Sequence, residues 1–188
     1  LKADIPELPD DKKKRFIEEF KVSAYEATIL VSDIETAKYF EEVVTKMGKN
    51  RDMKLAVNWI TGELFAVLNN KNLEISESPI SAKNLAKLIN LIKNGTISGK
   101  IAKTIFELMM DGDKDPQVIV EEKGLKQQSD PKALEALIDK IINDNREKAI
   151  EYKNGKEKLF GFFVGQAMKV SGGKANPQLI NEILKKKL

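Results

Sequence analysis

Residues 165–188 read GQAMKVSGGKANPQLINEILKKKL and contain the clearest local structural signals in the chain. Gly172 and Gly173 follow an apolar run, and glycine is the common residue just past a helix end. Asn176 and Pro177 then favour a new helix, because asparagine caps helix starts and proline suits the first helical position. The stretch therefore predicts two helices joined by a tight corner, with lysines around it.

The Gly-Gly-Lys sequence of this corner also suggests a nucleotide-binding loop. That loop needs G-x-x-x-x-G-K-[ST] between a strand and a helix. Met168 stands where the first glycine should be, Ala175 replaces the hydroxyl residue, and the preceding segment is helical in pattern. These three mismatches exclude a nucleotide-binding loop of this type at the corner. Two interpretations remain: a pair of helix caps alone, or caps whose free N–H groups and whose Lys169 and Lys174 also meet nucleic-acid phosphates.

The same start and stop signals recur along the whole chain, while strand-like alternation is almost absent. Apolar residues repeat at steps of three and four, and Gly48, Gly95 and Gly155 are expected helix ends. The pattern predicts an all-α fold, with a helical bundle followed by a small helical tail. The expected helix caps are Ser23 and Ser32 (each with a capping-box glutamate), Ser98, Asp115, Asp130, Asn145 and Asn176.

Two of the expected helices contain glycines and aromatic side chains at positions that suggest how the helices pack. In the run 51–70, we expect Trp59 to be buried and Gly62 to allow close helix packing. In GFFVG, we expect Gly161 and Gly165 to form a close helix contact, and Phe160, Phe163 and Val164 to pack the core of the tail.

The segment DGDKDP, residues 111–116, is the strongest break in the pattern. It lacks the twelve-residue register and the final glutamate of a calcium loop, so we interpret it as a solvated hinge. We expect a helical domain at 1–113 and a basic tail domain at 114–188. Their net charges are −1 and +4, and residues 152–188 alone carry +6. A basic end favours an anionic partner, although lysines also serve to solubilise a tail.

The composition excludes several classes of enzyme. The chain has no cysteine and no histidine, which removes disulfides, thiolate and imidazole metal sites, and histidine-based catalysis. The acidic pairs at 18–19, 41–42 and 121–122 lack the apolar neighbours that would raise a pKa for acid–base work. We therefore expect no catalytic residue and no metal site. No apolar run approaches the roughly 18 residues of a membrane span, and the leading leucine suggests a piece of a longer protein.

Three motifs together resemble one family. PELP at 6–9, NWITGEL at 58–64 and FFVGQAMKVSGGKANPQLINEIL at 162–184 resemble the C-terminal half of the B subunit (GatB) of glutamyl-tRNA(Gln)/aspartyl-tRNA(Asn) amidotransferases. The last part is also similar to the free-standing YqeY proteins. The specific motif is G-Q-x-M-K-x-x-x-G-K-A-N-P, which Gly165–Pro177 match.

The resemblance implies a helical domain and a YqeY-like tail domain of a cytoplasmic, ATP-dependent ligase complex in protein biosynthesis. It implies that ATP and Mg²⁺ bind a cradle domain outside this chain, and that an A subunit, which hydrolyses glutamine, and a C subunit are partners. The chain alone would then hold no cofactor and would not catalyse. Its implied role is to bind tRNA(Gln) or tRNA(Asn), recognising the tRNA body and D-loop corner by backbone and shape, while the mischarged tRNA is amidated elsewhere. DNA and membranes are not expected partners.

The residues expected to contact tRNA are lysines and corner residues. Lys169 and Lys174 would meet phosphates, the glycines would allow close approach, and Asn176 would cap the last helix. The full set is Lys169, Gly172, Gly173, Lys174 and Asn176, with Lys158, Lys185, Lys186 and Lys187 adding a weaker field. The alternative is a protein–protein docking module of the same complex that makes no direct contact with RNA.

Overall fold

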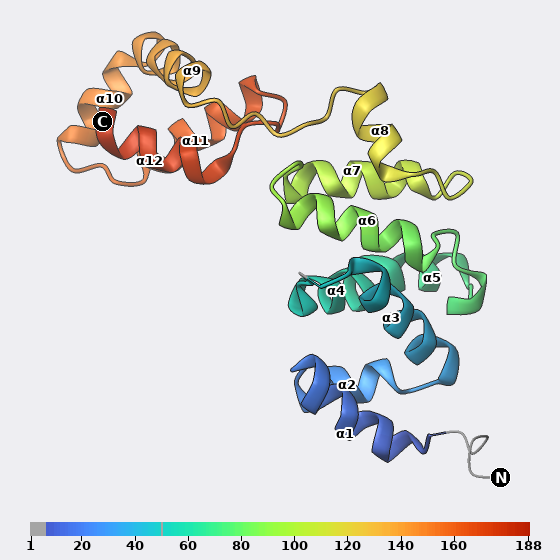
Figure 1. The fold of residues 1–188 in the computed structure, drawn as a ribbon. Helices are drawn as coiled ribbons and strands as arrows, with labels where there is room; N and C mark the ends of the chain where they lie inside the picture. The colour runs from blue at the N-terminus through green and yellow to red at the C-terminus, as the bar shows by residue number, and fades with distance from the viewer. Residues whose placement is uncertain (1–6, 50) are drawn as a thin grey trace. The chain divides into compact units, whose positions relative to one another are not determined.

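The computed structural model describes residues 7–49 and 51–188. Within these residues it contains helices and no strand, and Gln128 and Ala175 form an isolated parallel bridge. This confirms the all-α fold class (Figure 1). Two compact units can be distinguished. An N-terminal unit extends to Lys93 and includes Phe106–Val118, and a tail unit comprises Asn94–Ile105 and Ile119–Leu188. The expected domain limits at 113 and 114 stay a prediction.

The N-terminal unit is built around a cluster of phenylalanines and a pair of packed helices, α3 and α6. Phe16, Phe20 and Phe40 lie with their ring centroids 5.2–5.4 Å apart and are buried. The helices of this unit are α1 (Pro9–Phe20), α2 (Ala24–Leu30), α3 (Ile34–Met47), α4 (Met53–Asn58), α5 (Phe65–Lys71) and α6 (Ala82–Lys93). Residues of α7 (Gly99–Met109) and α8 (Pro116–Glu122) belong to both units.

Most of the expected helix caps are confirmed. Ser23 and Glu26 form the capping box of α2. The prediction of Ser32 as the cap of α3 was wrong. The helix begins one residue later, and the carboxylate of Asp33 accepts from the Thr36 N–H at 2.8 Å. Asn145 precedes α10 (Arg146–Lys153) but makes no side-chain cap bond. Caps at Ser98, Asp115, Asp130 and Asn176 accept from backbone N–H groups as expected.

The run 53–71 is one rod with a wider turn inside it. Residues Trp59–Leu64 form a π-helix between α4 and α5, and the Phe65 N–H donates to the Ile60 carbonyl five residues earlier. Trp59 is 6% exposed and packs on Phe106 with ring centroids 5.5 Å apart, which confirms its burial. The prediction for Gly62 was wrong, since the residue is exposed and an added Cβ would meet nothing within 4 Å.

The segment 111–116, interpreted as a solvated hinge, is exposed at Asp111, Gly112 and Lys114, but it is also fastened to the N-terminal unit. The Asp113 carboxylate accepts from the Ser81 N–H at 2.9 Å, and its carbonyl accepts from the Asn84 amide at 2.8 Å. Asp115 forms an ion pair with Lys87. These partners lie in or just before α6, far away in the sequence, which explains why local composition suggested a free loop.

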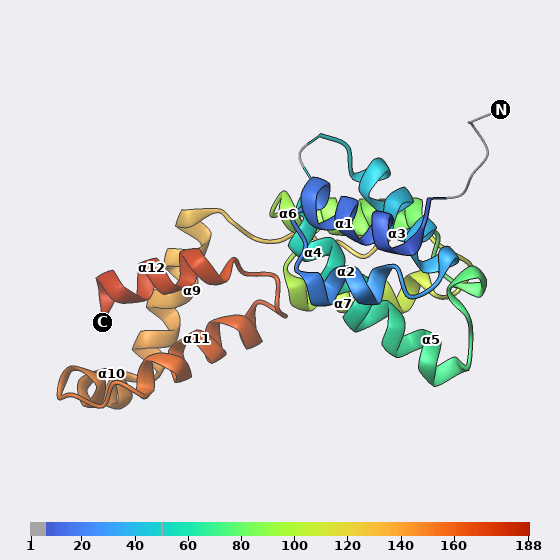
Figure 2. The ribbon, with the colours of Figure 1, turned by 90° about the horizontal axis from the view of Figure 1, so that it is seen from below.

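The tail unit packs four helices around its own core (Figure 2). They are α9 (Pro131–Asp144), α10, α11 (Leu159–Val170) and α12 (Pro177–Lys187). Phe163 is fully buried, and Phe160 and Val164 pack against the core, as expected. The prediction for Gly161 and Gly165 was wrong: both are exposed, and a Cβ on either would meet nothing within 4 Å. The buried core residues are Leu134, Ile138, Ile141, Ala149, Phe163, Ala167, Ala175, Ile180, Ile183 and Leu184.

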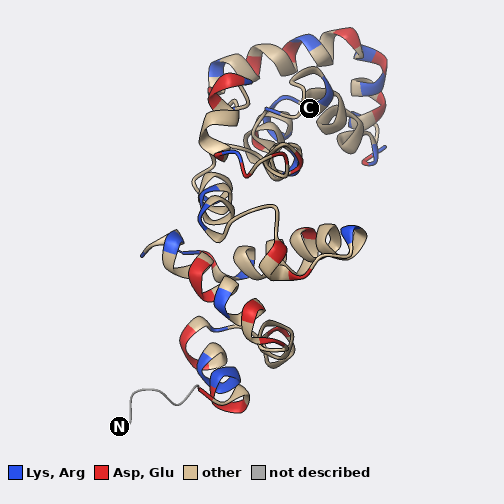
Figure 3. Cartoon of the chain, turned by 90° about the vertical axis from the view of Figure 1, so that its right-hand side faces the viewer, with Lys and Arg blue, Asp and Glu red and all other residues tan. Residues whose placement is uncertain are grey.

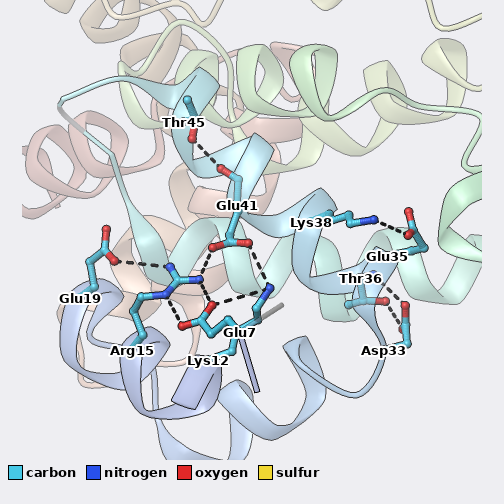
Figure 4. Close-up of polar contacts among 10 residues, drawn as sticks. All are labelled: Glu7, Lys12, Arg15, Glu19, Asp33, Glu35, Thr36, Lys38, Glu41 and Thr45. Carbon is cyan, nitrogen blue, oxygen red and sulfur yellow. Dashed lines mark hydrogen bonds and ion pairs between the residues drawn. The ribbon is translucent and has the colours of Figure 1, made fainter. Parts of the chain in front are cut away.

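Charged residues of both signs are spread over the helices (Figure 3), and one group forms a network near the N-terminus (Figure 4). Arg15 donates to both carboxylate oxygens of Glu7, at 2.8 and 2.7 Å, and also to Glu41. Lys12 lies 3.8 Å from Glu7 and 3.7 Å from Glu41. Hydrogen bonds from Arg15 lower the pKa of the Glu7 carboxyl below its ordinary value. The network therefore ties the chain just before α1 to α3.

Candidate nucleic-acid interface

The turn that joins α11 to α12, Ser171–Asn176, is called here the glycine corner. The Gly173 N–H donates to the Met168 carbonyl at 2.8 Å, and the Gly172 N–H donates to the Lys169 carbonyl at 3.1 Å. This pair of bonds closes the end of α11 in the manner of a Schellman motif. Gly172 and Gly173 have φ of +63° and +80°, a region that favours glycine. Both glycines are therefore required by the turn itself.

Asn176 caps α12, as expected. Its side-chain oxygen accepts from the Gln178 and Leu179 N–H groups at 3.0 and 3.4 Å. The N–H groups of Lys174 and Ala175 donate to Ser171, at 3.1 and 3.2 Å. The corner therefore satisfies its own backbone donors, and the start of α12 does not offer the open N–H groups that the sequence suggested. Attraction for an anion must come from side chains.

Two distant segments hold the corner in place. Gln128 pairs with the backbone of residues 174–176. Its N–H donates to the Lys174 carbonyl at 2.6 Å, and the Asn176 N–H donates to the Gln128 carbonyl at 3.0 Å. From the other segment, the Ser98 hydroxyl donates to the Gly173 carbonyl at 3.1 Å. Because hydrogen bonds from both Gln128 and Ser98 reach the corner, its backbone is held in place within the tail unit.

Lys169 and Lys174 lie at the corner together with the open face of Gly172. Lys169 is exposed on the last turn of α11, and Lys174 is half-buried in the corner. Within the described residues neither lysine has an acidic partner. Gly172 is exposed, with nothing within 4 Å of where a Cβ would stand. Two cations thus flank a patch of backbone that a large partner can approach.

The other candidates do not gather at the corner. Lys158 precedes α11, and this helix of 12 residues is roughly 18 Å long, with the corner at its far end. Lys185 and Lys186 are exposed on the last turn of α12, again at the end away from the corner. Lys187 lies 2.7 Å from Asp139, which partly neutralises its charge. Gly173 is buried, so it shapes the corner and is not itself accessible.

Sequence reasoning did not single out Lys100 as a neighbour of the corner. A Cβ on Gly173 would stand 3.3 Å from Lys100 Cδ and 3.8 Å from its Cε. No local pattern joins residues this far apart, and Ser98 carried only the signal of a helix cap. The segment 158–188 is strongly basic, because it holds six lysines and a single acidic residue, Glu182.

The described residues show neither a metal site nor a membrane helix. Among residues 7–49 and 51–188, no group of three or more acidic side chains is placed to hold a metal ion. In the same part of the chain, no helix has the length and apolarity to cross a membrane.

Residues 38–188 match the family model of the GatB domain. The chain belongs to the GatB family. The match includes the glycine corner and the lysines of the tail unit. Across its full 188 residues the chain is 95% identical to the B subunit of the aspartyl/glutamyl-tRNA(Asn/Gln) amidotransferase of Pelagibacter ubique (strain HTCC1062).

More distant GatB relatives give the same picture. The GatB proteins of Rickettsia africae (strain ESF-5) and Thioalkalivibrio sulfidiphilus (strain HL-EbGR7) are each 50% identical over the whole chain. The chain covers 38% of the length of the Pelagibacter and Rickettsia proteins and 39% of that of Thioalkalivibrio. It corresponds to the C-terminal part of GatB. The larger part of each relative thus lies outside the structure described here.

Proposed function

We propose that this chain is the tRNA-binding portion of the GatB component of a glutamine-dependent Glu-tRNA(Gln)/Asp-tRNA(Asn) amidotransferase. The observation that carries the proposal is the glycine corner, where Lys169 and Lys174 lie without acidic partners beside exposed Gly172. Membership of the GatB family supplies the class of partner, because the relatives are tRNA amidotransferase subunits by name. The amidation itself takes place outside this chain.

In this role the tail unit recognises RNA by backbone and shape. Lys169 and Lys174 neutralise phosphates of the tRNA near its D-loop corner, and Gly172 leaves room for the sugar-phosphate chain. Gly173 and Asn176 hold the corner in shape and do not bind. Lys158, Lys185 and Lys186 contribute a weaker field, because each lies about a helix length away. Aromatic side chains make up only 6% of the chain, so base stacking is not the main source of affinity.

The rest of the enzyme belongs to the same proposal. The part of GatB that precedes this chain would bind ATP and Mg²⁺ and carry the amidation site. An A subunit would supply ammonia from glutamine, and a C subunit would complete the cytoplasmic complex. The described residues would position tRNA(Gln) or tRNA(Asn) against that assembly.

A filter-binding titration tests the RNA role. The chain and a Lys169→Ala, Lys174→Ala double variant are titrated with a tRNA(Gln) transcript from low to moderate salt. We expect the variant to bind about tenfold more weakly, because an exposed ion pair contributes roughly 0.2–1 kcal/mol and a total loss of about 1.4 kcal/mol is a factor of ten. The slope of log affinity against log salt should fall by about 1 per lost phosphate contact.

A matched control uses two exposed lysines in the same unit, Lys140 of α9 and Lys153 of α10, each changed to alanine. This pair removes the same total charge away from the corner, so it should change the affinity much less. An equal loss for both pairs would reduce the site to a diffuse charge effect. An unchanged affinity for the corner variant would sink the assignment of these residues.

A second candidate function, a docking module for other subunits, is favoured by a separate observation. Leu8, Tyr25 and Ile34 of the N-terminal unit are 63%, 76% and 66% exposed. Large exposed apolar side chains are common singly, but they also mark protein contacts. If the parent chain retains no tRNA at low salt while subunit association depends on Tyr25, the docking function replaces the RNA function.

A further inference from the structure

We infer that Lys100 is a third phosphate-binding residue of the glycine corner, contributed by a segment far away in the sequence. The inference rests on the proposed function, since it names a further RNA contact at the same site. It goes beyond that proposal in one respect: the RNA surface is composite, with one of its cations supplied by residues 94–105 and two by residues 169–174.

The Lys100 side chain lies against Gly173. Its Cδ and Cε atoms lie 3.3 and 3.8 Å from where a Cβ on Gly173 would stand. The aliphatic stem therefore covers Gly173, and the absence of a side chain at Gly173 makes room for it. Lysine commonly lays its stem along a surface and keeps its ammonium group in water. The ammonium group of Lys100 is accordingly carried at the corner.

The backbone beside Lys100 is held at the corner by hydrogen bonds. Ser98 is buried, its hydroxyl donates to the Gly173 carbonyl at 3.1 Å, and it accepts from the Ile101 N–H at 3.2 Å. A second tie runs through Thr96, whose carbonyl accepts from the Gln127 N–H at 2.6 Å. The backbone that carries Lys100 is thus held beside the corner, and its side chain needs little ordering to act there.

Lys100 also adds a positive charge to the corner. Lys100 is exposed, and within the described residues it has no acidic partner, so all three of its N–H donors are open to a ligand. Together with Lys169 and Lys174 it gives three cations around one corner. Several cations without acids between them suit a chain of phosphates, whose binding they strengthen by releasing counterions. The backbone N–H groups of the corner are already bonded, so side-chain cations carry the attraction.

The test uses the complete 188-residue chain and a tRNA(Gln) transcript in the same salt titration. Lys100→Met removes the charge but keeps an unbranched apolar stem over Gly173. We expect a threefold to tenfold loss of affinity at low salt and a fall of about 1 in the salt slope. Lys100→Arg retains the charge and should restore most of the affinity. Lys140→Met on α9 is the matched control and should leave the slope unchanged.

Thermal melting of each variant separates binding from packing. A purely structural role for Lys100 would lower the melting temperature of Lys100→Met without changing the salt slope of the remaining binding, and that result would overturn the inference. Parent-like affinity and slope for Lys100→Met, beside a weakened Lys169→Ala, Lys174→Ala variant, would also overturn it while leaving the proposed function standing. If the parent chain itself shows no salt-dependent tRNA binding, the proposed function fails, and the inference fails with it.

Discussion

Gly165 and Gly172 lie at the two kinds of position that glycine occupies in this chain. Gly165 is inside α11, exposed, with open space where a Cβ would stand. Gly172 has equally open space but a φ of +63°, which a residue with a Cβ adopts at a cost. The same substitution should therefore have opposite effects at the two positions.

We expect Gly165→Ala to raise the free energy of unfolding by about 0.5–1 kcal/mol, because alanine restricts the unfolded chain and favours helix. Gly172→Ala should lower it by roughly 1–2 kcal/mol through backbone strain. Urea unfolding followed by circular dichroism measures both. If Gly165→Ala proved destabilising, the helix would need a close neighbour at that point, which the structure does not show.

At the scale of single residues, the sequence predicts what depends on near neighbours. The Ser23 capping box and the Asn176 cap involve residues two or three positions apart, so their spacing is visible in the chain. The burial of Trp59 follows from its helical face. The errors at Gly62, Gly161 and Gly165 have one cause: close packing needs a partner helix, and the sequence does not say which helix faces a glycine. The Ser98–Gly173 bond is hidden for the same reason.

At the scale of structural elements, the ion-pair network of Glu7, Arg15 and Glu41 should make the stability of the N-terminal unit depend on pH. Hydrogen bonds from Arg15 depress the pKa of Glu7 below its ordinary value of 4.5. A group whose pKa is lower in the folded state stabilises the fold above its unfolded pKa. The contribution is lost as the pH falls from about 4.5 through the folded pKa. The pKa of Glu26 is lowered in the same direction, by the hydrogen bond from the Ser23 N–H.

We expect Arg15→Met to flatten the acid limb of the stability curve of the N-terminal unit. Near neutral pH the change should cost at most about 1 kcal/mol, since partly exposed ion pairs contribute little. Thermal melting between about pH 3 and pH 7, followed by Trp59 fluorescence, measures both effects. Glu7→Gln should give the same flattening, because it removes the titrating group. If the curve for Arg15→Met ran parallel to the parent curve, the network of Glu7, Arg15 and Glu41 would not contribute to the pH dependence of stability.

The elements themselves are largely predictable from the sequence, and their irregularities are not. Periodicity and caps locate the helices, because both are local. The π-helix at Trp59–Leu64 is not visible, since a wider turn preserves the apolar pattern around it. The ties of the solvated segment 111–116 to Ser81, Asn84 and Lys87 are not visible in the sequence either, because only the fold brings these partners to it.

For the whole molecule, the two units have separate buried centres. Phe16, Phe20 and Phe40 lie in that of the N-terminal unit, and Phe163 lies in that of the tail unit. The single tryptophan, Trp59, belongs to the N-terminal unit, so its fluorescence reports on that unit. The composite candidate site could be predicted only in part, since the lysines of one segment are visible in the sequence and the contribution of residues 94–105 is not.

We expect Phe163→Ala to destabilise the tail unit by about 3–5 kcal/mol, the usual range for a buried phenylalanine. The loss of helical circular dichroism should then begin at a lower temperature, while the Trp59 fluorescence transition stays near that of the parent. Phe40→Ala, the matched change in the other unit, should move the fluorescence transition. If Phe163→Ala moved both signals together, the two units would unfold as one.

The π-helix also bears on which changes of chain length the rod 53–71 tolerates. A turn closed by a bond to the fifth residue back holds one residue more than an ordinary helical turn. Deletion of Gly62, which is exposed and where an added Cβ would meet nothing within 4 Å, would convert this turn to α-helix and leave Val57 and Leu68 facing the core. A deletion within α5 instead would rotate all later residues of that helix by about 100°. Inherited length variation in this rod should therefore be confined to residues 59–64.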